Sequence, residues 1–389
     1  MHLDDRPAPA TLTDLAARPG AAETARAIGP GRRLGLVVGD GPGVTVRTTA
    51  SGVEIDPGTD DATVVVAMDE PSWAALLAED LSGFGLLYSG RLTVQRGSFD
   101  QFAAWEPALQ ALLYDRPVYD REAASAFVDA PVARPFTLDD DPTAMAAALD
   151  RDGFLHVREV LDVATIAALS DEVDRLRAEA RPDDLRSWWA TLSDGTEVCC
   201  RVTYMEDRSP AVAALATDPR LGGLAALSGL ELEPSLHRND GISAVLKHGD
   251  VASGLADLPW HRDCGLGGHP FLCPGLLAGV QLDRADAAHG QLWFLPGSHR
   301  HGGPVGDPWG DGWPIVAVDT EPGDITVHYA HVLHAAPPPA EPGLGRRAVY
   351  VGWSRPELFA AVPAGKAYND VIYAEGDGHV RNVAEQSVS

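Results

Sequence analysis

The chain has 389 residues and a formal net charge of −26 at pH 7, and 45% of its residues are hydrophobic. This length allows two domains with cores of their own, whereas the acidic charge argues against nucleic acid or an anionic membrane surface as a partner. No run of about 18 apolar residues is present and residues 1–20 lack the apolar core of a signal peptide, so we expect a cytoplasmic protein without a membrane span.

The first part of the chain alternates between apolar and polar residues in a pattern typical of short strands. We expect strands at 34–38, 44–48, 53–55 and 62–68. Asp69 followed by Pro71 is typical of a helix start, and a strand at 92–94 and a helix over 99–113 are expected next. Because no histidine lies between positions 3 and 155, this region offers no imidazole ligand for a metal.

Residues 114–141 are rich in proline, alanine and acidic residues, which is typical of a connector between domains. A helix over about 142–150 and a strand at 154–157 are expected to follow. Asp162 is placed to cap the next helix, whose periodicity predicts one buried face. That face comprises Val163, Ile166, Leu169, Val173 and Leu176.

From residue 199 onward, short predicted strands are separated by turns rich in glycine and proline and not by long helices. They are expected at 202–205, 242–247, 276–282, 292–295, 325–328 and 348–353. This pattern predicts a jelly roll of two facing sheets. The adjacent Cys199 and Cys200 fall in a strand-like stretch, 198–202, and four cysteines are too few for a disulfide scaffold, so we expect both to be reduced core residues.

The triplet His261-Arg262-Asp263 combines two potential metal ligands with one intervening residue. In an extended segment residues i and i+2 point to the same side, so the first and third side chains converge while Arg262 turns away. Two imidazoles and one carboxylate are the protein ligands of a non-haem Fe(II) site, which leaves the opposite coordination positions open for chemistry. The third ligand has to come from another strand, for which the chain offers His328, His331 and His334.

Three segments carry a resemblance to a known family: Trp260-His261-Arg262-Asp263, Leu295-Pro296-Gly297-Ser298-His299, and Gly323–His328 continuing to Leu333-His334-Ala335. With these motifs, residues 137–373 closely resemble the phytanoyl-CoA dioxygenase family of Fe(II)/2-oxoglutarate oxygenases. The resemblance implies a double-stranded β-helix (cupin-like) domain with flanking helices that uses Fe(II), 2-oxoglutarate and O2. It also implies that Fe(II) is held by His261, Asp263 and His334, with His331 as the second choice for the distal ligand and His328 as the last.

The far carboxylate of 2-oxoglutarate requires a cation, and an arginine fits best because its planar fork binds a carboxylate through two hydrogen bonds. Neighbouring residues on a strand face opposite ways, so either Arg346 or Arg347 is expected here, and the resemblance favours Arg346. Lys247 is a further candidate, weighed against an exposed lysine at a strand end. Gln281 is another, weighed against a buried amide that is satisfied by backbone groups.

Two residues refine the expected reaction. The family commonly has serine or threonine two residues after the distal histidine, where this chain has Ala336, so one hydroxyl contact to the cosubstrate is missing. Halogenating relatives replace the carboxylate of the His-x-Asp motif, whereas this chain keeps Asp263. The resemblance therefore implies hydroxylation, or a related oxidation, of a C–H bond.

The segment Tyr88-Ser89-Gly90-Arg91-Leu92-Thr93-Val94 lies in a unit of strands followed by helices, and residues 12–120 resemble sterol-carrier-protein-like domains. Such domains hold an apolar ligand between a small sheet and helices. We therefore expect an α+β protein made of a sterol-carrier-like domain (1–120), a linker (121–136) and a jelly-roll oxygenase domain (137–389). The resemblance of the first domain implies an apolar small molecule or natural product as substrate.

Other interpretations of the same residues stay open at this point. The protein is alternatively a non-catalytic lipid-binding protein with a vestigial cupin domain, or a cupin enzyme that uses another metal. A zinc cluster of Cys264, His269 and Cys273 lacks the paired spacing of such sites. Trp260 and Trp293 are candidates for a substrate pocket, although aromatic residues are more often core residues. The run 367–373 is expected to form either a lid or a C-terminal brace.

Overall fold

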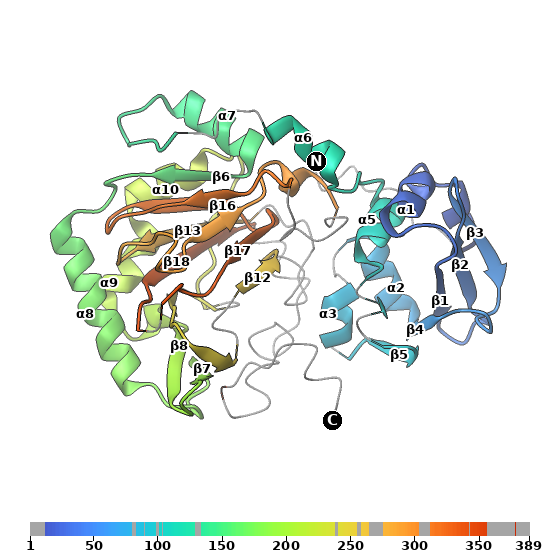
Figure 1. The fold of residues 1–389 in the computed structure, drawn as a ribbon, viewed down its shortest axis with the longest axis horizontal. Coiled ribbons are helices and arrows are strands. Elements are labelled where there is room, and N and C mark those ends of the chain that lie inside the picture. Colours follow the sequence, from blue (N-terminus) through green and yellow to red (C-terminus); the bar gives the residue numbers. More distant parts are fainter. Residues whose placement is uncertain are drawn as a thin grey trace.

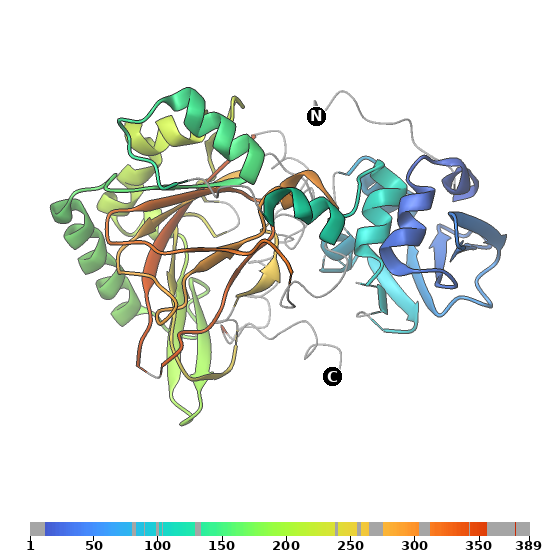
Figure 2. The same cartoon turned by 45° about the horizontal axis from the view of Figure 1, so that its top comes forward.

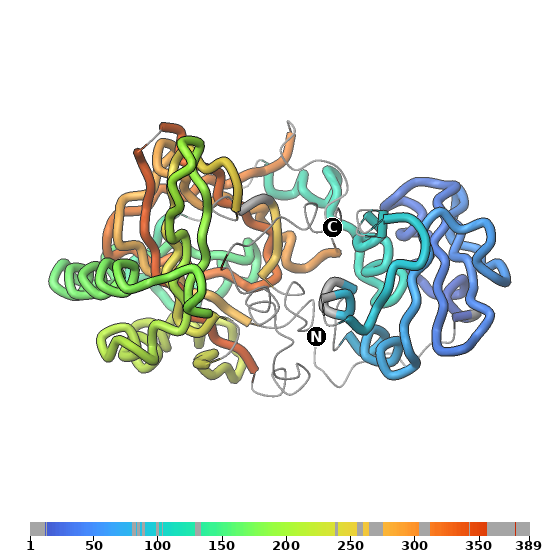
Figure 3. Tube along the Cα trace, turned by 90° about the horizontal axis from the view of Figure 1, so that it is seen from below, coloured from blue at the N-terminus to red at the C-terminus, as the bar shows by residue number. Residues whose placement is uncertain are grey.

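Five strands and several helices from the first third of the chain form one end of the molecule, and two further sheets form the other end (Figure 1). We call these parts the N-terminal unit (residues 12–114) and the C-terminal unit (residues 134–355). Seen from below, they lie at opposite ends of the molecule (Figure 3). The computed structural model describes residues 12–79, 83–88, 90–98, 101–102, 104–128, 134–237, 240–254, 258–263, 275–302, 312–341, 343–355 and 378.

The N-terminal unit contains a sheet with the strand order β3-β2-β1-β4-β5. β1 and β4 pair in parallel, and the other neighbouring strands pair antiparallel. The strands are β1 (Arg33–Val38), β2 (Val44–Thr48), β3 (Val53–Pro57), β4 (Val64–Met68) and β5 (Leu92–Arg96). All five were predicted, because their alternating apolar residues bury one face of the sheet.

Helices cover that buried face (Figures 1 and 2). Asp69 caps α2 as expected, since its carboxylate accepts a hydrogen bond from the backbone N–H of Ser72. The helix predicted over 99–113 is interrupted by a turn at Ala104 and Trp105, after which α5 begins. The helices are η1 (Leu12–Ala17), α1 (Ala21–Ile28), α2 (Glu70–Leu77), α3 (Gly83–Tyr88) and α5 (Glu106–Tyr114).

The predicted connector contains a helix, α6 (Arg121–Val128), and is not simply an extended linker. Figure 1 places α6 between the two units. Tyr119 and Ala124 are buried against Leu295, Trp313 and Leu333 of the C-terminal unit. A helix forms here because an amphipathic segment can bury its small apolar face on a neighbouring sheet.

The C-terminal unit is built around two sheets, as the jelly-roll prediction required. The larger sheet has the order β11-β7-β8-β10-β18-β13-β16-β6, with β9 paired to β18, and the smaller sheet has the order β12-β17-β14-β15. The larger sheet contains β6 (Phe154–Val157), β7 (Ser187–Leu192), β8 (Glu197–Val202), β9 (Glu233–Pro234), β10 (Ser243–Leu246), β11 (Val251–Ser253), β13 (Leu276–Gln281), β16 (Ile325–Tyr329) and β18 (Arg347–Ser354). The smaller sheet contains β12 (Leu258–His261), β14 (Leu292–Phe294), β15 (Val316–Val318) and β17 (His334–Ala336).

One predicted strand of this unit, 202–205, is wrong. β8 ends at Val202, and Tyr204 adopts a left-handed backbone conformation with φ of 51° immediately before the short helix η2. A left-handed residue ends a strand because its backbone cannot continue the extended pleat. The pair Cys199 and Cys200 lies inside β8 and is buried, as predicted.

Helices cover the outer face of the larger sheet, with α8 running along it (Figure 1). Asp162 caps α8 as predicted, and Ile166, Leu169, Val173 and Leu176 are buried. Val163 is 86% exposed, which contradicts its predicted place on the buried face, because a rotation of about 100° per residue leaves it at the edge of the buried stripe. The helices of this unit are α7 (Pro142–Asp152), α8 (Val163–Glu179), η2 (Met205–Asp207), α9 (Pro210–Ala213), η3 (Ala214–Thr217), α10 (Pro219–Ala226) and η4 (Ser298–Arg300).

We expect Leu169→Ala to lower the free energy of unfolding by about 2–5 kcal/mol, because it leaves a cavity between α8 and the larger sheet. Val163→Ala, on the same helix, is the matched control and should change this free energy by less than about 0.5 kcal/mol. Chemical denaturation followed by circular dichroism measures both values. Similar losses in the two variants would contradict the packing described for α8.

Alternate residues of the larger sheet face opposite sides, and this places the functional side chains. Ala244, Leu246, Ala278, Val280, Val349 and Val351 belong to the core beneath the helices. Their strand neighbours Val245, Lys247, Gln281 and Ala348 therefore point inward, toward the smaller sheet. In the part of the chain that is described, no helix has both the length and the apolar character needed to cross a membrane.

Candidate metal centre

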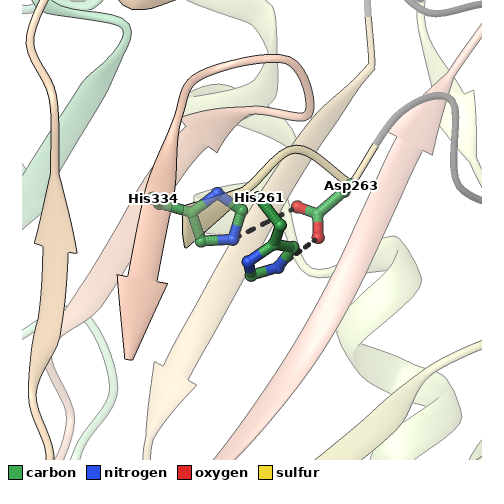
Figure 4. A group of neighbouring side chains, drawn as sticks. All are labelled: His261, Asp263 and His334. Atoms are coloured by element: carbon green, nitrogen blue, oxygen red, sulfur yellow. Dashed lines mark ion pairs between the residues drawn. The ribbon is translucent and has the colours of Figure 1, made fainter. Parts of the chain in front are cut away.

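His261, Asp263 and His334 come together on the smaller sheet (Figure 4). The nitrogen and oxygen atoms that these residues offer as ligands all lie within 4.8 Å of one another. β12 and β17 pair antiparallel with His261 opposite His334, and the centroids of the two imidazole rings are 4.2 Å apart. Asp263 follows the end of β12 by two residues and faces both rings, as the i, i+2 argument predicted.

The protonation of this cluster suits a divalent cation. Burial favours the neutral form of Asp263, but the nearby imidazoles of His334, His261 and His328 keep the pKa of its carboxyl well below the usual value. Burial, with His261 alongside, lowers the pKa of His334 to about 3. An ionised carboxylate next to a neutral imidazole is the state in which these groups bind a metal, and two nitrogen ligands with one oxygen fit Fe(II).

The Asp263 carboxylate lies close to three imidazole rings. Its Oδ1 lies 3.5 Å from His261 Nε2, and its Oδ2 lies 3.7 Å from His334 Nε2. His328 Nε2 is closer still, at 3.2 Å from Oδ2, and the His328 side chain is buried on β16. Because the carboxylate is ionised, this approach places a proton on His328 Nε2, which then donates to Asp263.

Of the two alternative histidines, His328, which was ranked last, lies nearer to the cluster than His331. His328 lies against the cluster, with its ring centroid 4.7 Å from that of His334. His331 instead packs beside Tyr329 and His299, with ring-centroid distances of 5.4 and 6.0 Å. The signal for His328 was available in the sequence, since Ile325 and Val327 are core residues and the alternation turns His328 to the inner face.

Arg346 and Arg347 face opposite sides, and only one of them points inward. Arg346 is 2% exposed, its Nε donates to the backbone carbonyl of Gly290 at 2.9 Å, and its Nη1 is buried without a hydrogen-bond partner among the described residues. Arg347 instead forms ion pairs with Asp283 and Asp174, each at 2.8 Å. An inward guanidinium with an unused donor suits an anionic ligand, which supports the choice of Arg346.

Lys247 and Gln281 both lie on the inner face of the larger sheet. Lys247 is buried and donates from Nζ to the backbone carbonyl of Ala336, so it is not an exposed lysine at a strand end. Gln281 donates from Nε2 to Gly279 O at 3.1 Å and to Thr326 Oγ1 at 3.4 Å. The side-chain amide of Gln281 is therefore satisfied within the sheet, as the alternative interpretation expected.

Neither tryptophan that was considered for the substrate pocket faces the cluster. Trp260 packs beside Tyr119, Leu295 and Leu333 on the outer side of the smaller sheet. Trp293 alternates with Phe294, whose ring lies 5.9 Å from that of His334, and therefore turns to the opposite side. Each tryptophan therefore lies on the face opposite its inward-facing neighbour, His261 or Phe294.

An ion pair between Arg201 and Asp240 was not predicted from the sequence. Arg201 lies on the inner face, opposite Val245, its guanidinium stacks over the Trp188 ring at 4.7 Å, and its Nη2 donates to Ser243 Oγ at 3.2 Å. Burial raises the pKa of the Asp240 carboxyl, with Asp263 acting in the same direction and Arg201 acting against both. Both side chains are 18% exposed.

Further clusters and candidates lie away from the triad or outside the described residues. Glu206, Asp207 and His237 also gather, but Glu206 accepts hydrogen bonds from the backbone N–H groups of His237 and Ile242, which accounts for its place. Burial raises the pKa of the Cys199 and Cys200 thiols to about 12, so both are unreactive core residues. Cys264, His269, Cys273 and the run 367–373 lie outside the described residues.

Residues 149–348, slightly more than half of the chain, match the family model for phytanoyl-CoA dioxygenase (PhyH). No curated protein matches the chain at a significant level. Among solved structures, AviO1 from Streptomyces viridochromogenes Tue57 is 26% identical, with a TM-score of 0.44 over 56% of this chain and 96% of that one. The epimerase SnoN from nogalamycin biosynthesis is 28% identical (TM-score 0.42; 55% and 82% of the two chains), and EctD from S. alaskensis is 24% identical (TM-score 0.47; 59% and 83%).

Proposed function

Because the chain belongs to the phytanoyl-CoA dioxygenase family, we propose that it oxidises a C–H bond of a small molecule with His261, Asp263 and His334 as the ligands of its iron. The family uses Fe(II), 2-oxoglutarate and O2, and the chain is accordingly an Fe(II)/2-oxoglutarate-dependent oxidoreductase. The observation that carries the ligand assignment is the convergence of two imidazole nitrogens and a carboxylate oxygen within 4.8 Å. When bound, iron supplies the O2 activation that couples conversion of 2-oxoglutarate into succinate and CO2 to oxidation of the substrate.

The protein contributes ligands that already have the required charge and orientation. Neutral His334 and ionised Asp263 bind a divalent cation without first exchanging protons with solvent. His328 orients the carboxylate through a hydrogen bond at 3.2 Å and so fixes which oxygen remains for the metal. Phe294 packs against His334 and excludes water from that side of the ring.

Arg346 is proposed to bind the far carboxylate of 2-oxoglutarate, with Lys247 beside it. The two residues are joined through the backbone, since Lys247 N–H donates to Arg346 O at 2.8 Å. Both side chains are buried on the inner face, where a charge-assisted hydrogen bond is stronger than in water. Lys247 also donates to Ala336 O, two residues after His334, so it links the cosubstrate end of the interior to the ligand strand.

The substrate is proposed to be a small natural product with an apolar body and at least one polar group. Inward-facing Val245 and Ala348 provide apolar surface, whereas Arg201 on the same inner face and its partner Asp240 provide a donor and an acceptor. A site that holds buried hydrogen-bonding groups discriminates against substrates that leave those groups unpaired. We therefore propose an oxygenated natural product and not a pure hydrocarbon chain.

The N-terminal unit is proposed to be a sterol-carrier-like domain that receives an apolar ligand. Its five-stranded sheet has one face covered by helices, and the residues between them are apolar, including Leu34, Val66 and Leu112. The test is the binding of a fluorescent fatty acid to the full chain, competed by unlabelled lipid. Fluorescence that stays at the level of free probe would contradict this assignment.

The catalytic proposal is tested by incubating the full chain with Fe(II), 2-oxoglutarate and O2 and measuring succinate. We expect succinate without added substrate, and more of it when an oxygenated natural product is oxidised than when its deoxygenated analogue is supplied. A protein that retains iron but forms no succinate under any condition would overturn the proposal. Metal analysis of the purified protein separates the rival assignments, a cupin enzyme with another metal and a metal-free lipid carrier.

A further inference from the structure

Arg262 lies between two of the candidate iron ligands, and its side chain is only 5% exposed. It points to the outer side of the smaller sheet, away from the ligand cluster. Its Nη2 reaches the backbone carbonyls of Ser298 at 3.1 Å and His301 at 3.0 Å, and it also donates to the carbonyl of Gly302. These carbonyls belong to one loop, residues 296–302. A buried guanidinium with three carbonyl partners on this loop holds the backbone of its own segment against it.

The same loop also holds the strand that supplies the third ligand. Ser298 Oγ accepts a hydrogen bond from the backbone N–H of Leu333 at 2.8 Å, and Leu333 directly precedes His334. Ser298 is fully buried. Ser298 therefore contacts both ligand-bearing segments, through its carbonyl on one side and through its hydroxyl on the other.

Residues outside the C-terminal unit fix the position of this loop. Tyr119 donates from its hydroxyl to Pro296 O at 2.6 Å, and the N–H of Gly302 donates to Pro117 O at 2.9 Å. The ring of Phe127 from α6 lies where a side chain at Gly297 would be, and Gly297 has φ of 76°, so only glycine fits here. Residues 117–127 of the connector therefore pack closely against the loop.

A chain of polar side chains continues from this contact into the N-terminal unit. Arg116 pairs with Glu79 at 2.6 Å and donates to Gln110 Oε1 at 2.7 Å, and Gln110 in turn donates to Glu106 at 2.9 Å. This unit packs directly on the loop, because a Cβ added at Gly302 would lie 3.1 Å from Gln110 Cβ. Burial raises the pKa of the Glu106 carboxyl, and the charge of Arg262 acts in the opposite direction. The four side chains are held together without reaching the ligand cluster itself.

We propose that the N-terminal unit and the connector form part of the metal centre, with Arg262 as the positioning residue that couples them to it. The inference rests on the proposed ligand set. Arg262 and Ser298 fix the spacing between the segments of His261–Asp263 and His334 from outside. Tyr119 and Pro117 of the connector and Gln110 of the N-terminal unit fix the loop in turn. The unit is therefore more than a carrier attached to an independent enzyme.

The test compares Arg262→Met with Arg262→Lys in the full chain by anaerobic titration with Co(II) in the presence of 2-oxoglutarate. Methionine keeps the length and removes every donor, and we expect about 10–100-fold weaker Co(II) binding and an altered absorption spectrum. Lysine keeps three donors for the three carbonyls, so its affinity should lie between those of wild type and Arg262→Met. Arg284→Met, at an exposed ion pair with Asp286, removes the same charge elsewhere and should match wild type.

Glu106→Gln tests the contribution of the N-terminal unit and avoids the ligand segment entirely. It keeps the hydrogen bond to Gln110 but removes the charge that interacts with Arg262, and we expect about 2–5-fold weaker Co(II) binding. Wild-type affinity and spectrum in both Arg262→Met and Glu106→Gln would overturn the inference. If Arg262→Met does not fold, the same result in Arg262→Lys and Glu106→Gln overturns it. A wild-type chain that binds no metal would instead overturn the proposed function.

Discussion

Replacement of His334 by alanine is expected to abolish metal binding and succinate formation. The imidazole is buried, neutral and within 4.8 Å of the other two ligand atoms. Its loss therefore removes one of the three protein ligands. We expect at least about a thousandfold weaker Fe(II) binding, because apparent metal-binding energies of about 10–16 kcal/mol are shared among few ligands. Anaerobic Fe(II) titration with 2-oxoglutarate measures the loss.

His331→Ala is the matched control for this experiment. It removes the same side chain three residues away, from a position beside Tyr329 and His299 and not beside Asp263. We expect its iron affinity and succinate formation to stay close to those of wild type. Full iron occupancy and unchanged 2-oxoglutarate consumption in His334→Ala, or loss of both in His331→Ala alone, would refute the ligand assignment.

Arg346→Met is expected to raise the KM for 2-oxoglutarate by about 30-fold or more. The variant leaves a buried carboxylate without its cation, and truncating one member of a buried charge pair costs about 2–5 kcal/mol. Because the lost contact binds the cosubstrate before and during the reaction, kcat should fall much less than KM rises. Initial rates of succinate formation over a range of 2-oxoglutarate concentrations separate the two effects.

Arg347→Met provides the comparison at the neighbouring position. Its guanidinium pairs with Asp283 and Asp174 on the other side of β18, so the variant should lose stability and keep its KM. Arg346→Lys tests geometry, since an ammonium keeps the charge but lacks the planar fork that binds a carboxylate through two hydrogen bonds. An unchanged KM in Arg346→Met would show that another cation anchors the cosubstrate.

Local pattern predicted most of the strands because burial of one face imposes a period of two on the sequence. Ser243–Leu246 and Leu276–Gln281 were expected to within one or two residues for this reason. The sequence pattern gave wrong predictions where contacts with other parts of the fold decide the local structure. Val163 lies three residues before buried Ile166, yet it falls at the edge of the buried stripe of α8 and is exposed. The helix α6 forms from a segment whose composition is typical of a connector.

The candidate site also combines features that the sequence predicts with features that depend on the fold. The convergence of His261 and Asp263 follows from two residues of extended chain, so it was predictable without a fold. The contact between His328 and Asp263 joins different sheets, and the Arg201–Asp240 pair joins a strand to a turn, so both depend on how the sheets face each other. That Arg262 turns away was predicted, but its three carbonyl partners belong to a distant loop.

The pairing of β12 with β17 sets His261 opposite His334, and this register limits how descendants of the chain can diverge. A single inserted or deleted residue within either strand would send one imidazole to the far side of the sheet. Insertions or deletions of a residue are therefore tolerable in the loops outside β12 and β17, whereas within either strand they would abolish catalysis. Related proteins can change their substrate through differences in loop length, whereas the position of His261 opposite His334 has to stay the same.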